Sequence, residues 1–259
     1  MGLDLLLGAL GFLSGFLSGL LGIGGGIIMA PLLLYMPPLL GFEPFPMRVV
    51  AGLTIVQGLL ACFSGALSHR RFRFLSDQLA LLMGSTIFVA ALAGGAASHY
   101  VSNELLLLLF GGLALTAAIL MLMPAAGESE DPDMTEMSFS RFRAVTAASG
   151  VGLLGGLVGQ GGSFMLIPLM TAYVQIPTRI AIGSNLAIVF LSSLAGTIGK
   201  AATGQIEWLL IIPIALTTIP AARLGSFVSR RTPVHGLRRL LAVLISLAAL
   251  RIWWSVIVA

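Results

Sequence analysis

Long apolar runs, interrupted by short polar stretches, extend along the whole chain. No charged residue occurs between Leu5 and Phe42, nor between Ala144 and Pro177. Four further runs are equally free of charge: Val49–Leu67, Leu79–Ser98, Leu105–Ala126 and Ile180–Gly199. Roughly 20 apolar residues suffice for a helix to cross a bilayer, and in hydrocarbon the backbone has to bond to itself. Continuous runs, in place of the alternating pattern of a membrane barrel, predict an all-α integral membrane protein.

The pattern predicts two series of helical segments, and glycines interrupt each series after its first segment. The first series comprises Leu3–Leu21, Ile27–Leu40, Arg48–Leu67, Asp77–Ala97 and Asn103–Met123. The second comprises Phe142–Leu157, Phe164–Val174, Thr178–Ala201, Ile206–Val228 and Val234–Ile257. A polar linker between them holds five acids: Glu128, Glu130, Asp131, Asp133 and Glu136. We therefore divide the chain into a first membrane repeat at 1–123, an acidic linker at 124–140 and a second membrane repeat at 141–259.

The two series repeat one another in sequence. Residues 19–32 read GLLGIGGGIIMAPL and residues 156–169 read GLVGQGGSFMLIPL, so that seven of the fourteen positions are identical. The stretch Arg48–Thr54 matches Arg179–Asn185 in the same order, and further glycines correspond, Gly65 with Gly196 and Gly94 with Gly225. Matches that keep the same order over half of a chain indicate an internal structural repeat.

Equivalent loops of the two repeats carry opposite arginine bias. Three arginines, at 70, 71 and 73, follow the third segment of the first repeat, where the second repeat has only Lys200. Conversely, Arg230 and Arg231 follow the fourth segment of the second repeat, where the first repeat has no lysine or arginine. Lysine and arginine concentrate on the cytoplasmic side of a membrane, so equivalent loops should face opposite sides. This predicts two inverted repeats.

The number of membrane crossings indicates whether the chain turns back at its two glycine-rich stretches, residues 22–26 and 159–162. For the arginine-rich loops all to face the cytoplasm, the chain has to reverse at residues 159–162. By the repeat, we expect it to reverse at residues 22–26 as well. Each would then be either a re-entrant hairpin or a pair of short spans. On this count the acidic linker faces the cytoplasm and both termini lie outside.

Composition excludes several other classes of protein. The chain of 259 residues is 58% hydrophobic and 9% charged, whereas a soluble domain carries about 25% charged residues. The sequence pI near 10 does not indicate nucleic-acid binding, because the basic residues lie in short loops between apolar runs. Cys62 is the single cysteine, so no intramolecular disulfide can form. No phosphate-binding loop of the GxxxxGK[ST] type appears, and we expect no cofactor and no metal.

The two glycine-rich stretches, which we call break 1 (residues 22–26) and break 2 (residues 159–162), are the candidate substrate site. Glycine permits a sharp turn and close approach of a ligand to the backbone, and the helix that follows begins with N–H groups that favour anions. Broken helices at matching points of inverted repeats indicate the site of a transporter. The candidate residues in the breaks and at the helix start that follows are Gly24, Gly25, Gly26, Gln160, Gly161, Gly162 and Ser163.

Polar residues inside apolar segments add to this site. They are Thr54, Gln57, Ser184 and Asn185, for which helix-to-helix bonding is an equally good explanation. Arg48 and Arg179 stand at the start of equivalent segments. Each could attract an anion, or it could be an interfacial residue that orients its helix. Close packing explains Gly11, Gly15 and Gly19 well, but it explains three consecutive glycines poorly.

A Gly-rich break followed by proline, once in each half of a small membrane protein, resembles the TauE/SafE family of sulfite and sulfonate exporters. The resemblance rests on Gly19–Pro31, Gly156–Pro168 and the two arginine-led helix starts, and it spans nearly the whole chain outside the linker. It implies a cytoplasmic-membrane transporter of small anions, often sulfur-containing ones.

The sequence therefore favours a secondary transporter or facilitator, whose partners are a small anionic substrate and the lipid bilayer. An anion channel with two re-entrant pore loops is the alternative. An enzyme is not expected, because the apolar segments contain no paired His, Asp, Glu or Cys. The substrate, the direction of transport, the coupling ion and any homo-oligomer are left open.

Overall fold

The computed structural model describes residues 2–69, 76–122, 139–159, 162–229 and 231–258, and within these ranges every regular element is helical. The first half contains α1 (Gly2–Leu21), α2 (Gly26–Leu39), α3 (Met47–His69), α4 (Asp77–Ala97), the short η2 (Ser98–Tyr100) and α5 (Asn103–Leu122). The second contains α6 (Arg141–Val158), α7 (Ser163–Leu169), η3 (Met170–Val174), α8 (Thr178–Ala202), α9 (Trp208–Ser229) and α10 (Val234–Val258). The all-α prediction is confirmed. Most of the acidic linker and the arginines at 70, 71, 73 and 230 lie outside the described residues.

Six of the described helical stretches are long and apolar enough to cross a membrane. They are Gly2–Leu21, Met47–Ser64, Asp77–Tyr100, Asn103–Leu120, Ile180–Ala202 and Trp208–Ser229. The helices after the two breaks are shorter, Gly26–Leu39 and Ser163–Ala172. The single helix predicted at Phe164–Val174 is instead formed by α7 and a following π-helical turn, η3, which begins shortly after Pro168. Proline lacks the N–H that continues an α-helical ladder, and a local change of helix type accommodates this loss.

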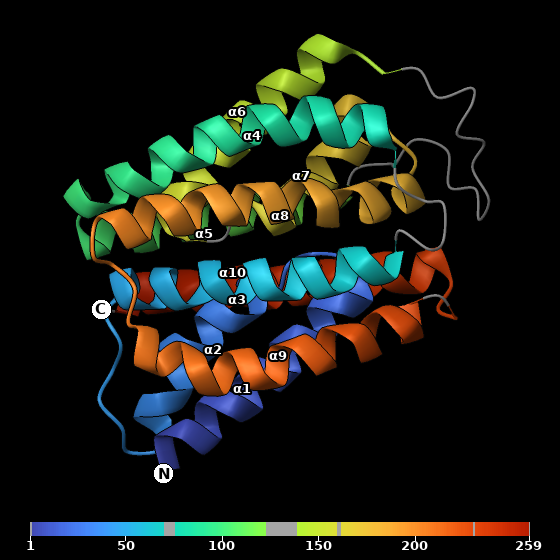
Figure 1. Ribbon diagram of the computed structural model, residues 1–259. Coiled ribbons are helices and arrows are strands. Elements are labelled where there is room, and N and C mark those ends of the chain that lie inside the picture. Colours follow the sequence, from blue (N-terminus) through green and yellow to red (C-terminus); the bar gives the residue numbers. More distant parts are fainter. Residues whose placement is uncertain (1, 70–75, 123–138, 160–161, 230, 259) are drawn as a thin grey trace.

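The helices form two layers, and each layer mixes both halves of the chain (Figure 1). One layer contains α4–α8, and the other contains α1–α3 together with α9 and α10. The helix pairs that pack together correspond between the halves. α1 packs on α9 as α6 packs on α4, while α3 packs on α8 and α5 on α10 across the layers. Figure 1 also places both termini at one end of the bundle and the last turns of α3 and α9 at the other.

Glycines bring α1 and α9 into backbone contact. A side chain at Gly11, Gly15 or Gly19 would collide with the backbone of α9 at Ile214, Thr218 or Ala222. These glycines recur every fourth residue and therefore share one helix face, as is typical of packing in membranes. The packing role expected for them is confirmed.

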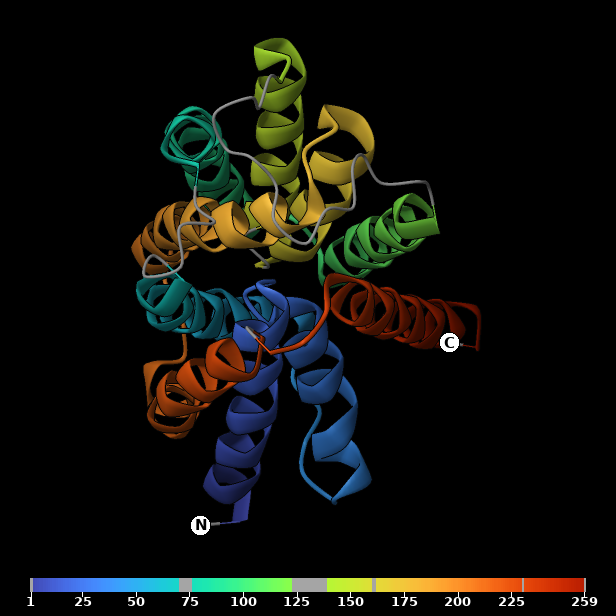
Figure 2. The same cartoon turned by 90° about the vertical axis from the view of Figure 1, so that its right-hand side faces the viewer.

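The helices α3 and α8 form the centre of the molecule. They are 72% buried over their spanning windows, whereas the other four candidate spans are 33–44% buried. In Figure 2, α1 and α2 extend from the middle toward one side and α6 and α7 toward the opposite side. The two breaks consequently lie in the interior, against the central helices.

Candidate functional site

Positive φ angles end the helix before each break. In break 1, Gly22, Gly24 and Gly25 have φ of 70°, 68° and 79°. In break 2, Gly159 and Gly162 have φ of 77° and 73°, while Gln160 and Gly161 lie outside the described residues. Residues with a Cβ rarely adopt this left-handed conformation, so glycine is required at these turns. Because α2 begins at Gly26 and α7 at Ser163, both predicted helix interruptions are present.

Break 1 contacts the start of the helix that follows break 2. A Cβ on Gly24 would lie 3.0 Å from the Cβ of Ser163, the first residue of α7. The same position would lie 3.1 Å from the Sγ of Cys62 on α3 and 3.2 Å from a methyl group of Val189 on α8. Break 1 and α3, from the first half of the chain, therefore meet α7 and α8, from the second half, at Gly24.

Each break is held by the central helix of the other half. From α8, the Asn185 amide donates hydrogen bonds to the carbonyl oxygens of Gly22 and, at 3.2 Å, of Ser163. From α3, the Thr54 hydroxyl donates to the carbonyl of Gly159 at 2.9 Å. Thr54 and Asn185 are the last residues of the matching stretches in the two halves, and Gly22 and Gly159 also correspond. These bonds satisfy carbonyls that the breaks remove from the helical ladder.

Several buried polar atoms around the breaks have no hydrogen-bond partner among the described residues. They include both polar atoms of the Gln57 amide, the hydroxyls of Ser163 and Ser193, and the Oδ1 of Asn185. Their side chains are at most 1% exposed. A buried polar group without a partner costs roughly 1–3 kcal/mol, and such groups in a native protein commonly meet a ligand, ion or water. The group therefore fits a bound polar ligand.

Two of the predicted site residues have partners elsewhere. The Ser184 hydroxyl accepts a hydrogen bond from the backbone N–H of Ser76, the residue that caps α4. Arg48 donates from its side chain to the carbonyl of Val101, and its backbone N–H donates to the Asn103 side chain. Arg48 thus ties the start of α3 to the start of α5. The structure does not describe the side chain of Arg179.

Sequence reasoning overlooked several neighbours of the breaks. A Cβ on Gly25 would lie 2.7 Å from the Gln57 amide, as predicted, but also 3.0 Å from the carbonyl of Ser14 on α1. On α8, the Ser193 hydroxyl lies 3.5 Å from the position of a Cβ on Gly58, beside the carbonyl of Gly24. The signal that could have found Ser193 is its place two helical turns beyond Asn185 on the same face of α8.

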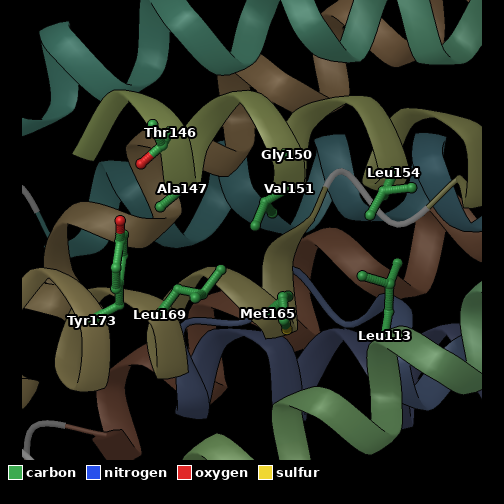
Figure 3. Close-up of a pocket in the computed structure, with 9 residues that line it drawn as sticks. All are labelled: Leu113, Thr146, Ala147, Gly150, Val151, Leu154, Met165, Leu169 and Tyr173. Carbon is green, nitrogen blue, oxygen red and sulfur yellow. The ribbon is translucent and has the colours of Figure 1, made fainter. Parts of the chain in front are cut away.

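A groove of about 350 Å³ opens behind break 2, between α5, α6 and α7 (Figure 3). Its walls are almost entirely apolar, and Val151 in its lining also packs against Gly162. Thr146 and Tyr173 supply its polar groups, at one end in Figure 3. Apolar walls suit hydrocarbon, so this groove does not share the polar chemistry at the breaks.

The described residues form only helical elements and include six candidate membrane spans, and the interrupted helices meet beside buried polar groups. Together with the comparisons below, this places the chain in the class of multi-pass membrane transporters. The particular family follows from comparison with known proteins. The chain belongs to the family described as "Sulfite exporter TauE/SafE", whose model matches residues 7–252.

Three curated relatives are similar over most of their length. "Probable membrane transporter protein YunE" of Bacillus subtilis (strain 168) is 24% identical over 86% of this chain and 87% of its own. "Probable membrane transporter protein YjnA" of the same organism is 28% identical over 94% and 97%. A "Probable membrane transporter protein" of Haemophilus influenzae is 22% identical over 94% and 95%. The comparison with solved structures gave no significant match.

Proposed function

We propose that the protein is a secondary transporter or facilitator that moves a small, sulfur-containing anion, such as sulfite or a sulfonate, across the cytoplasmic membrane. The substrate binds near the midplane between breaks 1 and 2. The observation that carries this proposal is the contact of break 1, at Gly24, with Ser163 at the end of break 2, beside buried polar atoms that have no partner among the described residues. The family name supports the choice of substrate class.

The site offers two kinds of donor to an anion. The first N–H groups of α2 and α7 are free of helical partners, and helix starts favour negative charge. The Gln57 amide and the Ser163 hydroxyl add side-chain donors that bind no other described group. The oxygens of a sulfite or sulfonate group can accept from several such donors at once.

We also propose that the halves are inverted repeats in the membrane. The corresponding helix pairs, α1 on α9 and α6 on α4, support this arrangement, as does the opposite arginine bias of equivalent loops. With both arginine-rich loops in the cytoplasm, the acidic linker is cytoplasmic and both termini lie outside. Single cysteines placed at Arg71 and Arg231, in a Cys62→Ala background, should both react only from the cytoplasmic side. Labelling of one of them from outside would contradict the inverted topology.

Flux through the purified protein in liposomes tests the site. Wild-type protein should transport sulfite or methanesulfonate, and Gly25→Leu and Gly162→Leu should abolish this flux. A side chain at Gly25 would displace the Gln57 amide, and one at Gly162 would press on Val151. Gly112→Leu on α5 is the matched control, because the space around Gly112 is open.

The outcomes separate three hypotheses. Retained flux in folded Gly25→Leu protein would remove the site from break 1. Saturation at millimolar substrate or below supports a carrier, whereas unitary currents would support the channel that the sequence left open. The three relatives are named as transporters, which gives that channel no support.

A further inference from the structure

Lys200, in the last turn of α8, is a fully buried lysine. Its ammonium donates hydrogen bonds to the Ser98 hydroxyl, at 2.7 Å, and to the carbonyl of Leu157, at 3.2 Å. These bonds use two of its three N–H donors. A buried cation within a membrane-spanning helix is energetically expensive, and such residues usually serve a function.

The charged neighbour of Lys200 is another cation. Arg48, at the start of α3, bonds the same turn after α4 as Lys200 does: its side chain donates to the carbonyl of Val101 at 3.1 Å, and the N–H of Val101 donates to the carbonyl of Ser98. The positive charge of Arg48 therefore repels that of Lys200. The Nε of Arg48 is buried and has no hydrogen-bond partner in the described part of the chain. No carboxylate in the described ranges forms a salt bridge with either residue. Two adjacent cations without a counter-charge are unfavourable until an anion joins them.

The Lys200–Arg48 pair lies next to break 2. Lys200 donates to the carbonyl of Leu157. Leu157 precedes Gly159 by two residues, and the carbonyl of Gly159 accepts the hydrogen bond from Thr54. The start of α3 and the end of α8 lie at the end of the bundle that carries both termini (Figure 1). The pair is therefore placed between that end of the molecule and the breaks.

We propose that Lys200 and Arg48 form an anion-binding station for the transported substrate, separate from the polar groups at the breaks. The free N–H of Lys200 and the Nε–H of Arg48 supply two charged donors to one small oxyanion, such as sulfite or an alkanesulfonate. This inference rests on the proposed function. It adds a second station at the end of the path nearest the termini.

A purely structural role for Lys200 is the competing explanation. Lysine often bonds the last carbonyls of a helix, where the helix dipole favours a positive charge, and Leu157 lies in the last turn of α6. That role accounts for the bond to Leu157. It does not account for a second cation, Arg48, which bonds the same turn after α4 and whose Nε–H has no partner among the described residues.

The test is sulfite flux in liposomes that contain the full-length protein, measured over a range of sulfite concentrations and ionic strengths. Lys200→Met should raise the KM for sulfite at least tenfold and weaken its dependence on ionic strength. Lys200→Arg should restore the KM to within about threefold of wild type, since it keeps the charge. Ser98→Ala removes a hydrogen bond of Lys200 but no charge, and it should leave the KM within about twofold.

Arg48 provides an independent pair of variants in case Lys200→Met fails to fold. Arg48→Gln should raise the KM for sulfite at least fivefold, and Arg48→Lys should restore most of it. An unchanged KM in folded Lys200→Met or Arg48→Gln protein would overturn the station. An equal rise in Lys200→Met and Ser98→Ala would assign Lys200 to structure.

Failure of this inference can be told from failure of the proposed function. If Gly25→Leu abolishes flux while Lys200→Met and Arg48→Gln keep the wild-type KM, only the station is refuted. If wild-type protein carries neither sulfite nor methanesulfonate, the proposed substrate class is wrong and the station falls with it.

Discussion

Breaks 1 and 2 share a backbone conformation but differ in their surroundings. In both, glycines with positive φ end one helix and precede the next. Gly25 in break 1 faces the Gln57 amide and the carbonyl of Ser14, whereas Gly162 in break 2 faces the side chain of Val151. In the aligned halves, Val151 occupies the position of Ser14, and Ile188 occupies that of Gln57.

This difference separates two properties of the site. The glycines provide the turn in both halves, so the turn is symmetric. Apart from the Lys200–Arg48 pair, the side chains that could bind a ligand are concentrated at break 1, while an apolar groove lies behind break 2. If the proposed function holds, the substrate would be held mainly on the side of break 1, while break 2 and the start of α7 would contribute chiefly backbone and the Ser163 hydroxyl.

The largest effect on stability is expected where a glycine rests on backbone. In Gly159→Ala, the new methyl group would collide with the carbonyl group of Ala51, which cannot move without shifting α3. Left-handed conformation costs a residue with a Cβ about 1–2 kcal/mol, and overpacking adds roughly 1–3 kcal/mol. In Gly22→Ala, the nearest atoms are a side-chain methyl of Ile182 at 2.8 Å and its carbonyl oxygen at 3.0 Å, both farther away than the Ala51 oxygen is in Gly159→Ala, so the loss should be smaller. Melting temperatures of the purified variants measure both changes.

The control for this comparison is Gly150→Ala in α6, where a Cβ would meet open space and the backbone is helical. It should melt at or slightly above the wild-type temperature, because alanine favours the helix over glycine. A Gly159→Ala protein as stable as this control would contradict the close packing of break 2 on α3.

Much of the fold followed from the sequence because it depends on periodic and repeated features. Apolar runs gave the helices, and repeated glycines gave both interruptions. Residue-by-residue matching of the halves also brought out Thr54 and Asn185, which bond the two breaks in the structure. Those two residues occupy equivalent positions in the two halves, because each donates a hydrogen bond to an equivalent glycine carbonyl.

Other parts of the site could not be read from sequence, because they depend on contacts between segments far apart in the chain. Ser184 is as polar and as deeply placed as Asn185, yet its hydroxyl serves the start of α4. The sequence analysis assigned Lys200 to a loop between two segments, whereas in the structure it is buried and bonds Ser98. The signal was present as a single lysine at the end of a charge-free run, but its burial required the fold.

A smaller loss of stability is expected from the bonds between halves. Asn185→Leu removes donors from two buried carbonyls, of Gly22 and Ser163, and should cost roughly 1–3 kcal/mol. Thr54→Val leaves one carbonyl, of Gly159, without that donor and should cost about 1 kcal/mol, in line with interhelical bonds in membranes. Melting temperatures check this order, with Thr116→Val on the exposed face of α5 as the control. Equal losses at Thr54 and Thr116 would show that the bond between halves contributes nothing.

The smallest effect on stability, but a clear effect on transport, is expected at Gln57. Its amide has no hydrogen-bond partner among the described residues, so Gln57→Leu removes an unsatisfied buried group and should leave the melting temperature unchanged or higher. If the amide binds the substrate, the KM for sulfite should rise about tenfold, which corresponds to roughly 1.4 kcal/mol. Ile188→Leu, at the position of α8 that is equivalent to Gln57 in the aligned halves, should alter neither property. A Gln57→Leu protein with wild-type KM would contradict the asymmetry, because it would leave break 1 no better suited to the anion than break 2.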